Sequence, residues 1–167
     1  MQHLERLDQM ASFLQVPAHE FIIALKKDLN ISMFVIYTWR SPATQQSLFE
    51  QGRAIDRETG EWVITAPKLV VTNAAPGQSP HNATYESGNP ASVAMDLVPM
   101  SEKGTLLWET PLSQWQKIFT YAWKFGFDPL GDTIGASYER DRCHFEEPNW
   151  KQKYRGLDLV MPTAVHI

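Results

Sequence analysis

The sequence has little cysteine, no long apolar run and no excess of basic residues, and each of these absences excludes a class of protein. The single cysteine, Cys143, excludes an internal disulfide and a structural zinc site built from several thiolates. No apolar stretch approaches the roughly 20 residues of a membrane-spanning helix, so we expect no integral membrane segment. The net charge of −4 argues against a nucleic-acid partner, which would require a basic stripe.

The length and composition indicate one domain. A chain of 167 residues, 43% of them hydrophobic, is long enough for one hydrophobic core and too short for two ordinary ones. We therefore predict a single domain over residues 1–167, with residues 1–30 forming N-terminal helices, and we expect a monomer. Charged residues such as Glu5 and Arg6 near the start do not fit a secretory signal. We expect the chain to be made in a cytoplasm without a signal peptide.

The first third of the sequence alternates helical and extended patterns. Apolar residues recur at helical spacing over Leu4–Leu14 and predict an amphipathic helix, after which Pro17 opens a second short helix. The β-rich run Met33–Thr38 is typical of a buried strand. Ser41, followed by a proline, is an N-cap signal for a helix that ends near Gly52.

The remaining chain combines short strands with long loops, and the whole indicates an α+β fold. We predict a small, mostly antiparallel sheet packed against helices in a single domain, with long loops that carry the functional site. The predicted elements are a hairpin or excursion loop over 54–65, a short strand over 68–72, a long loop over 73–90, a strand over 92–98, a helix capped by Thr110 and Pro111 and ended by Gly126, and a last short strand over 143–145.

Two histidines and one aspartate are the candidate metal ligands. His81 lies in the long loop, His144 in the last predicted strand, and Asp96 inside an otherwise apolar strand. A carboxylate in an apolar strand is costly unless it is paired or metal-bound. Two histidines and a carboxylate are a common catalytic zinc set. The other histidines are interpreted as non-functional: His3, His19 and His166.

Two acids near His144 are candidates for a general base. Asp141 lies three residues before His144 and Glu146 two residues after it. On a strand, an offset of two shares a face and an offset of three does not. Asp141 can therefore act as the general base only if it lies in a turn before the strand, and the polar run Tyr138–Arg142 permits such a turn.

Three segments resemble the motifs of one known family in the order typical of that family. Arg40 lies in the first segment, His81 and Asp96 in the second, and His144 in the third. The segments are Thr38–Pro42 with Gln45, Leu48, Gly52 and Arg53; then Val71–Ala74, Pro76–Asn82 and Ala94–Asp96; then Asp141–Glu146. They resemble, respectively, the arginine motif, the first zinc motif and the last motif of the zinc D-Ala-D-Ala carboxypeptidase and L-alanyl-D-glutamate endopeptidase family, and the chain is most similar to single-domain phage endolysins.

The resemblance implies a role for each candidate. His81, Asp96 and His144 would bind one Zn²⁺ per chain, and Asp141 would be the general base. Arg40 would hold the scissile carbonyl oxygen and its developing negative charge, so that Arg40→Ala would slow hydrolysis without loss of metal. Of the remaining residues, Ser79 and Gln45 would bind substrate or brace the site. Glu146 would contact a metal ligand and hold it in place without binding the metal itself.

The sequence departs from the family pattern in two places. His81 and Asp96 are separated by residues 82–95, a longer spacer than is usual in the family. This spacer contains an apparent insertion over Thr84–Pro90, and we expect the insertion to form a loop beside the substrate cleft. The usual proline before the last histidine is replaced by Cys143. A residue next to a ligand on a strand points to the opposite face, so we expect a buried thiol there rather than a fourth ligand.

The implied function is hydrolysis of an amide bond in the stem peptide of peptidoglycan. The leading hypothesis is cleavage of L-Ala-D-Glu, as in endolysins, and the alternative is a D-Ala-D-Ala carboxypeptidase. A non-catalytic zinc-stabilised wall-binding module is a third reading, although it would not need Asp141 or Arg40. Because the motifs use nearly all of the chain, we expect no separate wall-binding domain. The enzyme would act on the wall after release, in the host periplasm if a phage encodes it. A carboxypeptidase also needs a cation for the terminal carboxylate, and the candidates are Arg53, Arg140 and Arg142.

Overall fold

A four-stranded antiparallel sheet forms the centre of the molecule. The computed structural model describes residues 3–130, 141–153 and 159–161. The sheet has the order β1-β5-β7-β6, and every strand pair named among the described residues is antiparallel. Its strands are β1 (Ser32–Tyr37), β5 (Ala94–Met100), β7 (His144–Glu146) and β6 (Asp128–Pro129). Helices and an antiparallel sheet confirm the predicted α+β class.

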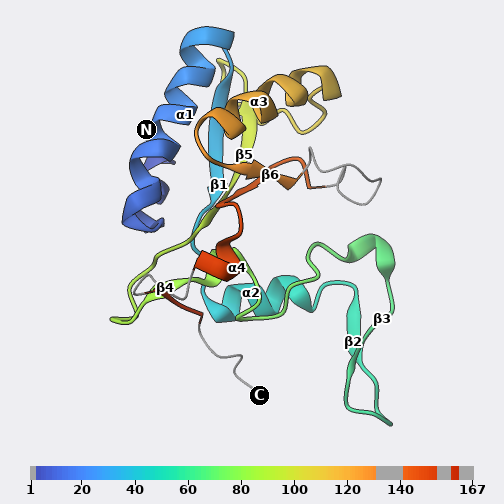
Figure 1. Cartoon of the computed structure of the whole chain (residues 1–167). Coiled ribbons are helices and arrows are strands. Elements are labelled where there is room, and N and C mark those ends of the chain that lie inside the picture. The colour runs from blue at the N-terminus through green and yellow to red at the C-terminus, as the bar shows by residue number, and fades with distance from the viewer. Residues whose placement is uncertain (1–2, 131–140, 154–158, 162–167) are drawn as a thin grey trace.

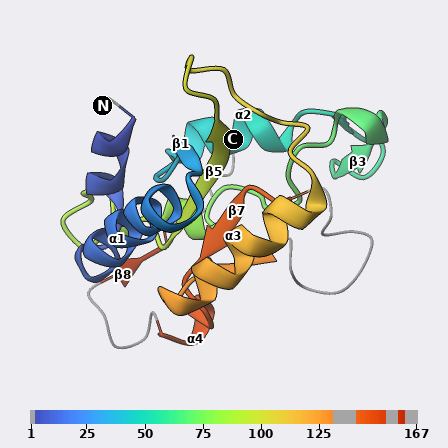
Figure 2. The same ribbon diagram turned by 90° about the horizontal axis from the view of Figure 1, so that it is seen from above.

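Two helices cover one face of this sheet. Helix α1 (Ser12–Leu29) and helix α3 (Leu112–Lys124) lie along the sheet (Figures 1 and 2). Their apolar side chains meet the strands in one cluster, in which the ring of Phe21 lies 5.5 Å from that of Phe145 on β7. One face of each central strand is therefore committed to this core, and the side chains between point to the opposite face.

The register of the sheet decides which residues share the face opposite this core. Residues directly opposite on antiparallel strands point to the same side. Met95 pairs with Phe145 on the core side, so Asp96 and its partner His144 both point to the other side. A bulge after Val35 sets Tyr37 opposite Asp96.

The N-terminal helices differ from the prediction. A short 3₁₀ helix covers Leu4–Gln9, and α1 then runs from Ser12 with Pro17 inside it. Pro17 therefore does not open a second helix. Because Pro17 lies in the second turn, it removes only one early backbone hydrogen bond, and the burial of residues such as Leu14 and Ala18 against the sheet stabilises a continuous helix.

The predicted helix after Ser41 is confirmed, and of the two forms predicted for residues 54–65 the structure has the hairpin. Helix α2 spans Pro42–Phe49, and the Ser41 side chain caps it by accepting from the Thr44 N–H at 3.1 Å. Gly52 follows with φ of 77°, and a Cβ there would lie 2.5 Å from the Ala66 carbonyl oxygen. This close approach folds the chain from α2 into a hairpin of β2 (Arg53–Ile55) and β3 (Trp62–Ile64), which projects beside α2 in Figure 1.

Three other expectations for the elements need correction. The strand predicted over 68–72 is absent from that described segment, where a 3₁₀ helix (Pro67–Leu69) leads into irregular chain. Helix α3 begins after Pro111 as predicted, but the Thr110 hydroxyl donates to the Leu107 carbonyl and no side chain caps the helix. The strand at His144 is not the last, because helix α4 (Trp150–Lys153) and strand β8 (Leu159–Val160) follow it.

Only the tip of the apparent insertion is an exposed loop. Strand β4 (Thr84–Tyr85) pairs with β8, and residues 86–89 form the exposed tip. Past the tip the chain is buried again, and Ser92 forms a bridge with Met10, which lies between the N-terminal 3₁₀ helix and α1. The ends of the insertion are therefore integral to the fold.

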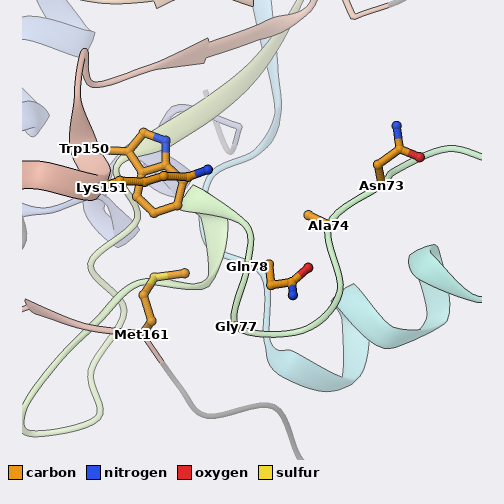
Figure 3. Close-up of a pocket in the computed structure, with 7 residues that line it drawn as sticks. All are labelled: Asn73, Ala74, Gly77, Gln78, Trp150, Lys151 and Met161. Carbon is orange, nitrogen blue, oxygen red and sulfur yellow. The ribbon is translucent and has the colours of Figure 1, made fainter.

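A surface cavity of about 530 Å³ opens between the 73–78 loop and the start of α4 (Figure 3). The loop continues into the short 3₁₀ helix Pro80–Asn82, and α4 begins four residues after β7 ends. In the described part of the chain, no helix combines the length and the apolar character needed to span a bilayer.

Candidate metal centre

His81 is held in place by the local fold of its loop. The Ser79 hydroxyl caps the short 3₁₀ helix by accepting from the His81 N–H at 3.3 Å. The His81 carbonyl accepts from the Arg40 N–H at 2.9 Å, and the Asn82 side chain donates to the Arg40 carbonyl at 2.9 Å. These bonds tie the loop to the segment that follows β1. The observed role of Ser79 is therefore to cap the turn that carries the histidine.

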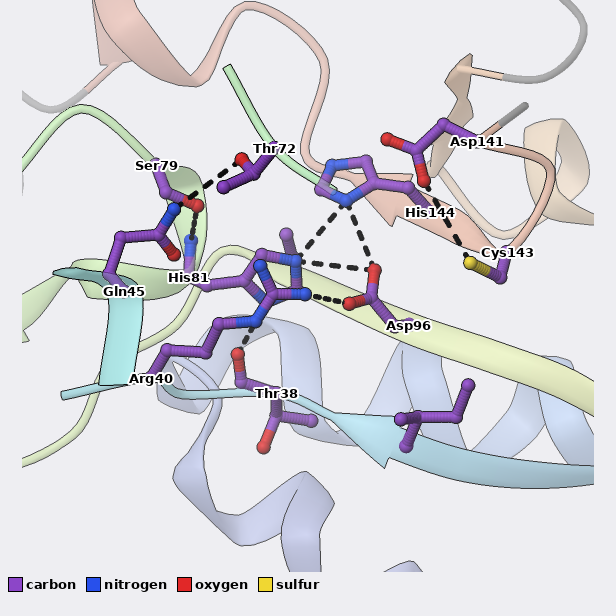
Figure 4. A network of polar contacts seen from close by, with 12 residues as sticks. Thr38, Arg40, Gln45, Thr72, Ser79, His81, Asp96, Asp141, Cys143 and His144 are labelled. Carbon is purple, nitrogen blue, oxygen red and sulfur yellow. Dashed lines mark hydrogen bonds and ion pairs between the residues drawn. The ribbon is translucent and has the colours of Figure 1, made fainter. Parts of the chain in front are cut away.

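His81, Asp96 and His144 converge on one point. Nε2 of His81 lies 3.2 Å from Nδ1 of His144, and Oδ1 of Asp96 lies 3.3 Å and 3.2 Å from these two nitrogens (Figure 4). Donor atoms about 2.0–2.1 Å from a tetrahedral zinc would lie about 3.3–3.4 Å from one another. The three side chains are buried, with exposed fractions of 0%, 6% and 6%. This group can hold one metal ion, and its spacing fits zinc.

The second nitrogen of each histidine has its own partner, which orients the ligand nitrogen. Nδ1 of His81 donates to the Thr38 carbonyl at 2.5 Å, and Nε2 of His144 donates to the Glu146 carboxylate at 3.0 Å. The remaining nitrogens, Nε2 of His81 and Nδ1 of His144, face Asp96. Such outer contacts fix tautomer and ring orientation in metal sites. Glu146 thus has the supporting position that the resemblance implied.

The electrostatics of the cluster favour a positive charge at its centre. Burial raises the pKa of Asp96, but His81, His144 and Arg40 outweigh it and hold the pKa well below its usual value. Burial opposes a charge on His144, yet hydrogen bonds to Asp96 and Glu146 raise its pKa to about 10. For His81, burial dominates and lowers the pKa. The carboxylate is therefore ionised and His81 is neutral, which are the forms that bind a metal, and His144 would release its second proton when a metal binds.

Arg40 contacts the carboxylate of Asp96. Its guanidinium pairs with Oδ2, the oxygen that does not face the histidines, and lies 4.9 Å from the centre of the Tyr37 ring. Nε of Arg40 is buried with no hydrogen-bond partner among the described residues. Arg40 is therefore part of the site, and its observed contact is with a ligand carboxylate, a contact that the sequence analysis missed.

Asp141 lies in the turn before β7, as a base at this position requires. Its carbonyl accepts from the His144 N–H at 3.2 Å, and the exposed carboxylate contributes to the raised pKa of His144. Cys143 is half-buried, and its sulfur lies 3.8 Å from Oδ1 of Asp141. Burial raises the pKa of this thiol, and it is not among the metal-binding group.

Of the other predicted residues, Gln45 and Arg53 brace the loop that leads to His81. Gln45 is fully buried and donates to the Ala74 carbonyl at 2.8 Å, so it supports the loop that leads to His81. Arg53 stacks on Phe49, 4.2 Å from the ring centre, and donates to Asn73 at 3.1 Å. Arg142 is half-buried, and Arg140 lies outside the described residues.

Several contacts of the site have no signature in the sequence. The Thr38 carbonyl also accepts from the Ser92 hydroxyl at 3.0 Å, and Arg6 donates to the carbonyls of Val35 and Ile36 at the bulge of β1. These bonds hold the chain that orients His81. A backbone carbonyl is present at every position, so no residue type could have pointed to Thr38.

The backbone arrangement is similar to that of a known zinc-binding enzyme. No family model matches the sequence. The fold resembles VanY. This vancomycin resistance D,D-pentapeptidase, from a VanB-type resistance cassette, was solved as a point mutant in complex with Zn(II). The match has a TM-score of 0.55 at 14% sequence identity and covers 87% of this chain and 76% of that one. At this identity the likeness establishes the fold.

Proposed function

We propose that this protein is a zinc-dependent peptidase that cleaves an amide bond in the stem peptide of peptidoglycan. The observation that carries the proposal is the convergence of His81, Asp96 and His144 at 3.2–3.3 Å, with each side chain held by a second contact. The shared fold with a D,D-pentapeptidase that binds Zn(II), together with the order of the motifs, supports zinc as the metal and peptidoglycan as the substrate.

The residues around the ligands have the chemistry that hydrolysis of an amide needs. Zinc at this position would lower the pKa of a water molecule and polarise the scissile carbonyl. Asp141 would accept the proton of the attacking water and pass it to the leaving amine. Arg40 would hold Asp96 in position as a zinc ligand, and its positive charge beside the metal would stabilise the oxygen that becomes negative.

Two bonds are candidates for cleavage. Removal of a terminal D-Ala is favoured by the likeness to a D,D-pentapeptidase across most of both chains. Cleavage of L-Ala-D-Glu is favoured by the resemblance of the motifs to those of compact endolysins. The fold comparison supports the carboxypeptidase more directly, and we propose it as the first activity to test.

Digestion of purified sacculi by the zinc-loaded protein, followed by mass spectrometry, tests both activities. A carboxypeptidase is expected to shorten pentapeptide stems by one D-Ala. An endopeptidase is expected to release peptides that begin with D-Glu. A zinc-loaded protein that binds sacculi but releases neither product would contradict the proposal and favour the non-catalytic binding module.

The contact between Arg40 and Asp96 leads to a separate expectation. Arg40→Ala should weaken zinc binding about tenfold to a hundredfold, because Asp96 loses the partner of its second oxygen. Competition with a chelator of known zinc affinity measures the change, and Arg53→Ala provides an arginine control outside the ligand set. If Arg40→Ala slows hydrolysis while zinc affinity is unchanged, Arg40 acts on the substrate alone, as the motif resemblance implied.

A further inference from the structure

The cavity near α4 is bordered by the two segments that carry the histidine ligands. One wall is the 73–78 loop, which leads to His81, and the other is the start of α4, which follows the strand of His144 (Figure 3). Gln45 and Asn82 bind the loop at Ala74 and Gly77, so the wall and the metal centre are parts of one hydrogen-bonded unit. A ligand in this cavity would lie against the same loop that positions His81.

The polar side chains that line the cavity offer hydrogen-bond donors. The carbonyl oxygen of Asn73 already accepts from Arg53, and that of Gln78 accepts from the Ala75 N–H at 3.2 Å. Their NH₂ groups have no partner within the described residues. Lys151 adds an ammonium group that makes no ion pair with any described residue, and none of the described lining residues is acidic. This set of donors suits an anion.

The remaining lining is apolar and supports the lysine. Nζ of Lys151 lies 5.4 Å from the ring centre of Trp150, and the indole and Met161 form part of the wall (Figure 3). A cation over an indole ring is stabilised by the ring quadrupole. The cavity therefore combines a positioned positive charge and amide donors with apolar surface, as a short peptide with a free carboxylate would require.

We propose that this cavity binds a free carboxylate of the stem peptide and that Lys151 is the cation that recognises it. This inference rests on the proposed function. The carboxylate has two possible sources: the α-carboxylate of D-Glu, which is free because the chain continues through its side chain, and the terminal carboxylate of D-Ala. Both present the same group to Lys151, and the substrate that is hydrolysed identifies the source.

The test uses two pairs of peptides that differ only in the charge of one group. The first pair is diacetyl-L-Lys-D-Ala-D-Ala and its C-terminal amide, and the second is N-acetyl-L-Ala-γ-D-Glu-L-Lys and its α-amide at D-Glu. The zinc-loaded parent is compared with Lys151→Ala and Lys151→Arg. The matched control is Lys124→Ala, since Lys124 is also exposed and lies 4.4 Å from the ring centre of Tyr121 on α3.

Lys151→Ala is expected to lower kcat/KM about tenfold on the carboxylate form of the hydrolysed peptide, through KM, because it removes a charge-assisted contact. The amide form should be unaffected, Lys151→Arg should retain most of the activity, and Lys124→Ala should match the parent. Equal effects of Lys151→Ala on both forms, or no effect on either, would overturn the inference. Neither outcome would contradict the proposed peptidase activity.

Calorimetric titration with the same peptides separates this inference from the proposed function. If the zinc-loaded parent hydrolyses none of the four peptides, the proposed function fails. The inference about the cavity is then tested by peptide affinity alone. It is supported if the carboxylate forms bind more tightly than the amide forms and Lys151→Ala removes this difference. Equal binding of carboxylate and amide forms overturns it.

Discussion

Replacement of His81, Asp96 or His144 by alanine is expected to abolish stoichiometric zinc binding and all hydrolysis. The parent should carry about one zinc per chain, because only one such group of ligands is found among the described residues. Each substitution removes one of three protein ligands. Loss of a supporting contact costs about tenfold to a hundredfold in metal affinity, and loss of a ligand should cost more.

Elemental analysis and thermal unfolding with and without zinc measure this effect. Zinc should raise the Tm of the parent, because a ligand that binds only the folded state stabilises it. His19→Ala is the matched control, since His19 lies on α1 and outside the ligand group. Full zinc occupancy in all three variants would show that the metal binds elsewhere.

Asp141→Asn is expected to slow hydrolysis at least about a hundredfold while zinc binding stays like that of the parent. The amide keeps the shape of the side chain but cannot accept the proton of the attacking water. Asp141 lies in the turn before β7 and is not one of the three ligands, so the metal content should not change. Single-turnover rates on the preferred peptide, with zinc content measured in the same sample, separate an effect on hydrolysis from an effect on zinc binding.

Glu146→Gln is the comparison that identifies the base. Glu146 accepts from Nε2 of His144, so this variant should weaken zinc binding about tenfold to a hundredfold and recover activity when zinc is added. If Glu146→Gln abolishes turnover with zinc bound while Asp141→Asn remains near the parental rate, Glu146 is the base. The assignment of Asp141 would then be wrong.

The sequence by itself determined the elements that depend on local patterns, and it named the three residues that the structure brings together as a candidate metal site. The strand predicted over Met33–Thr38 (observed as Ser32–Tyr37), the cap at Ser41 and the helix before Gly126 follow from periodicity and backbone preference, which act over a few residues. Asp96 was recognisable because an ionised side chain in an apolar strand requires a partner. Its grouping with His81 and His144 followed from residue chemistry and motif order.

The tertiary structure decided everything that depends on which segments meet. Burial against the sheet keeps α1 continuous through Pro17, and β4 exists only because β8 returns to pair with it. The choice of the Thr38 carbonyl for His81 follows from the chain after the bulge in β1, and no residue type encodes it. The approach of Lys151 to the loop that carries His81 depends on the turn after β7. Such contacts join residues far apart in the chain, so their partners were set by packing and register rather than by any local pattern.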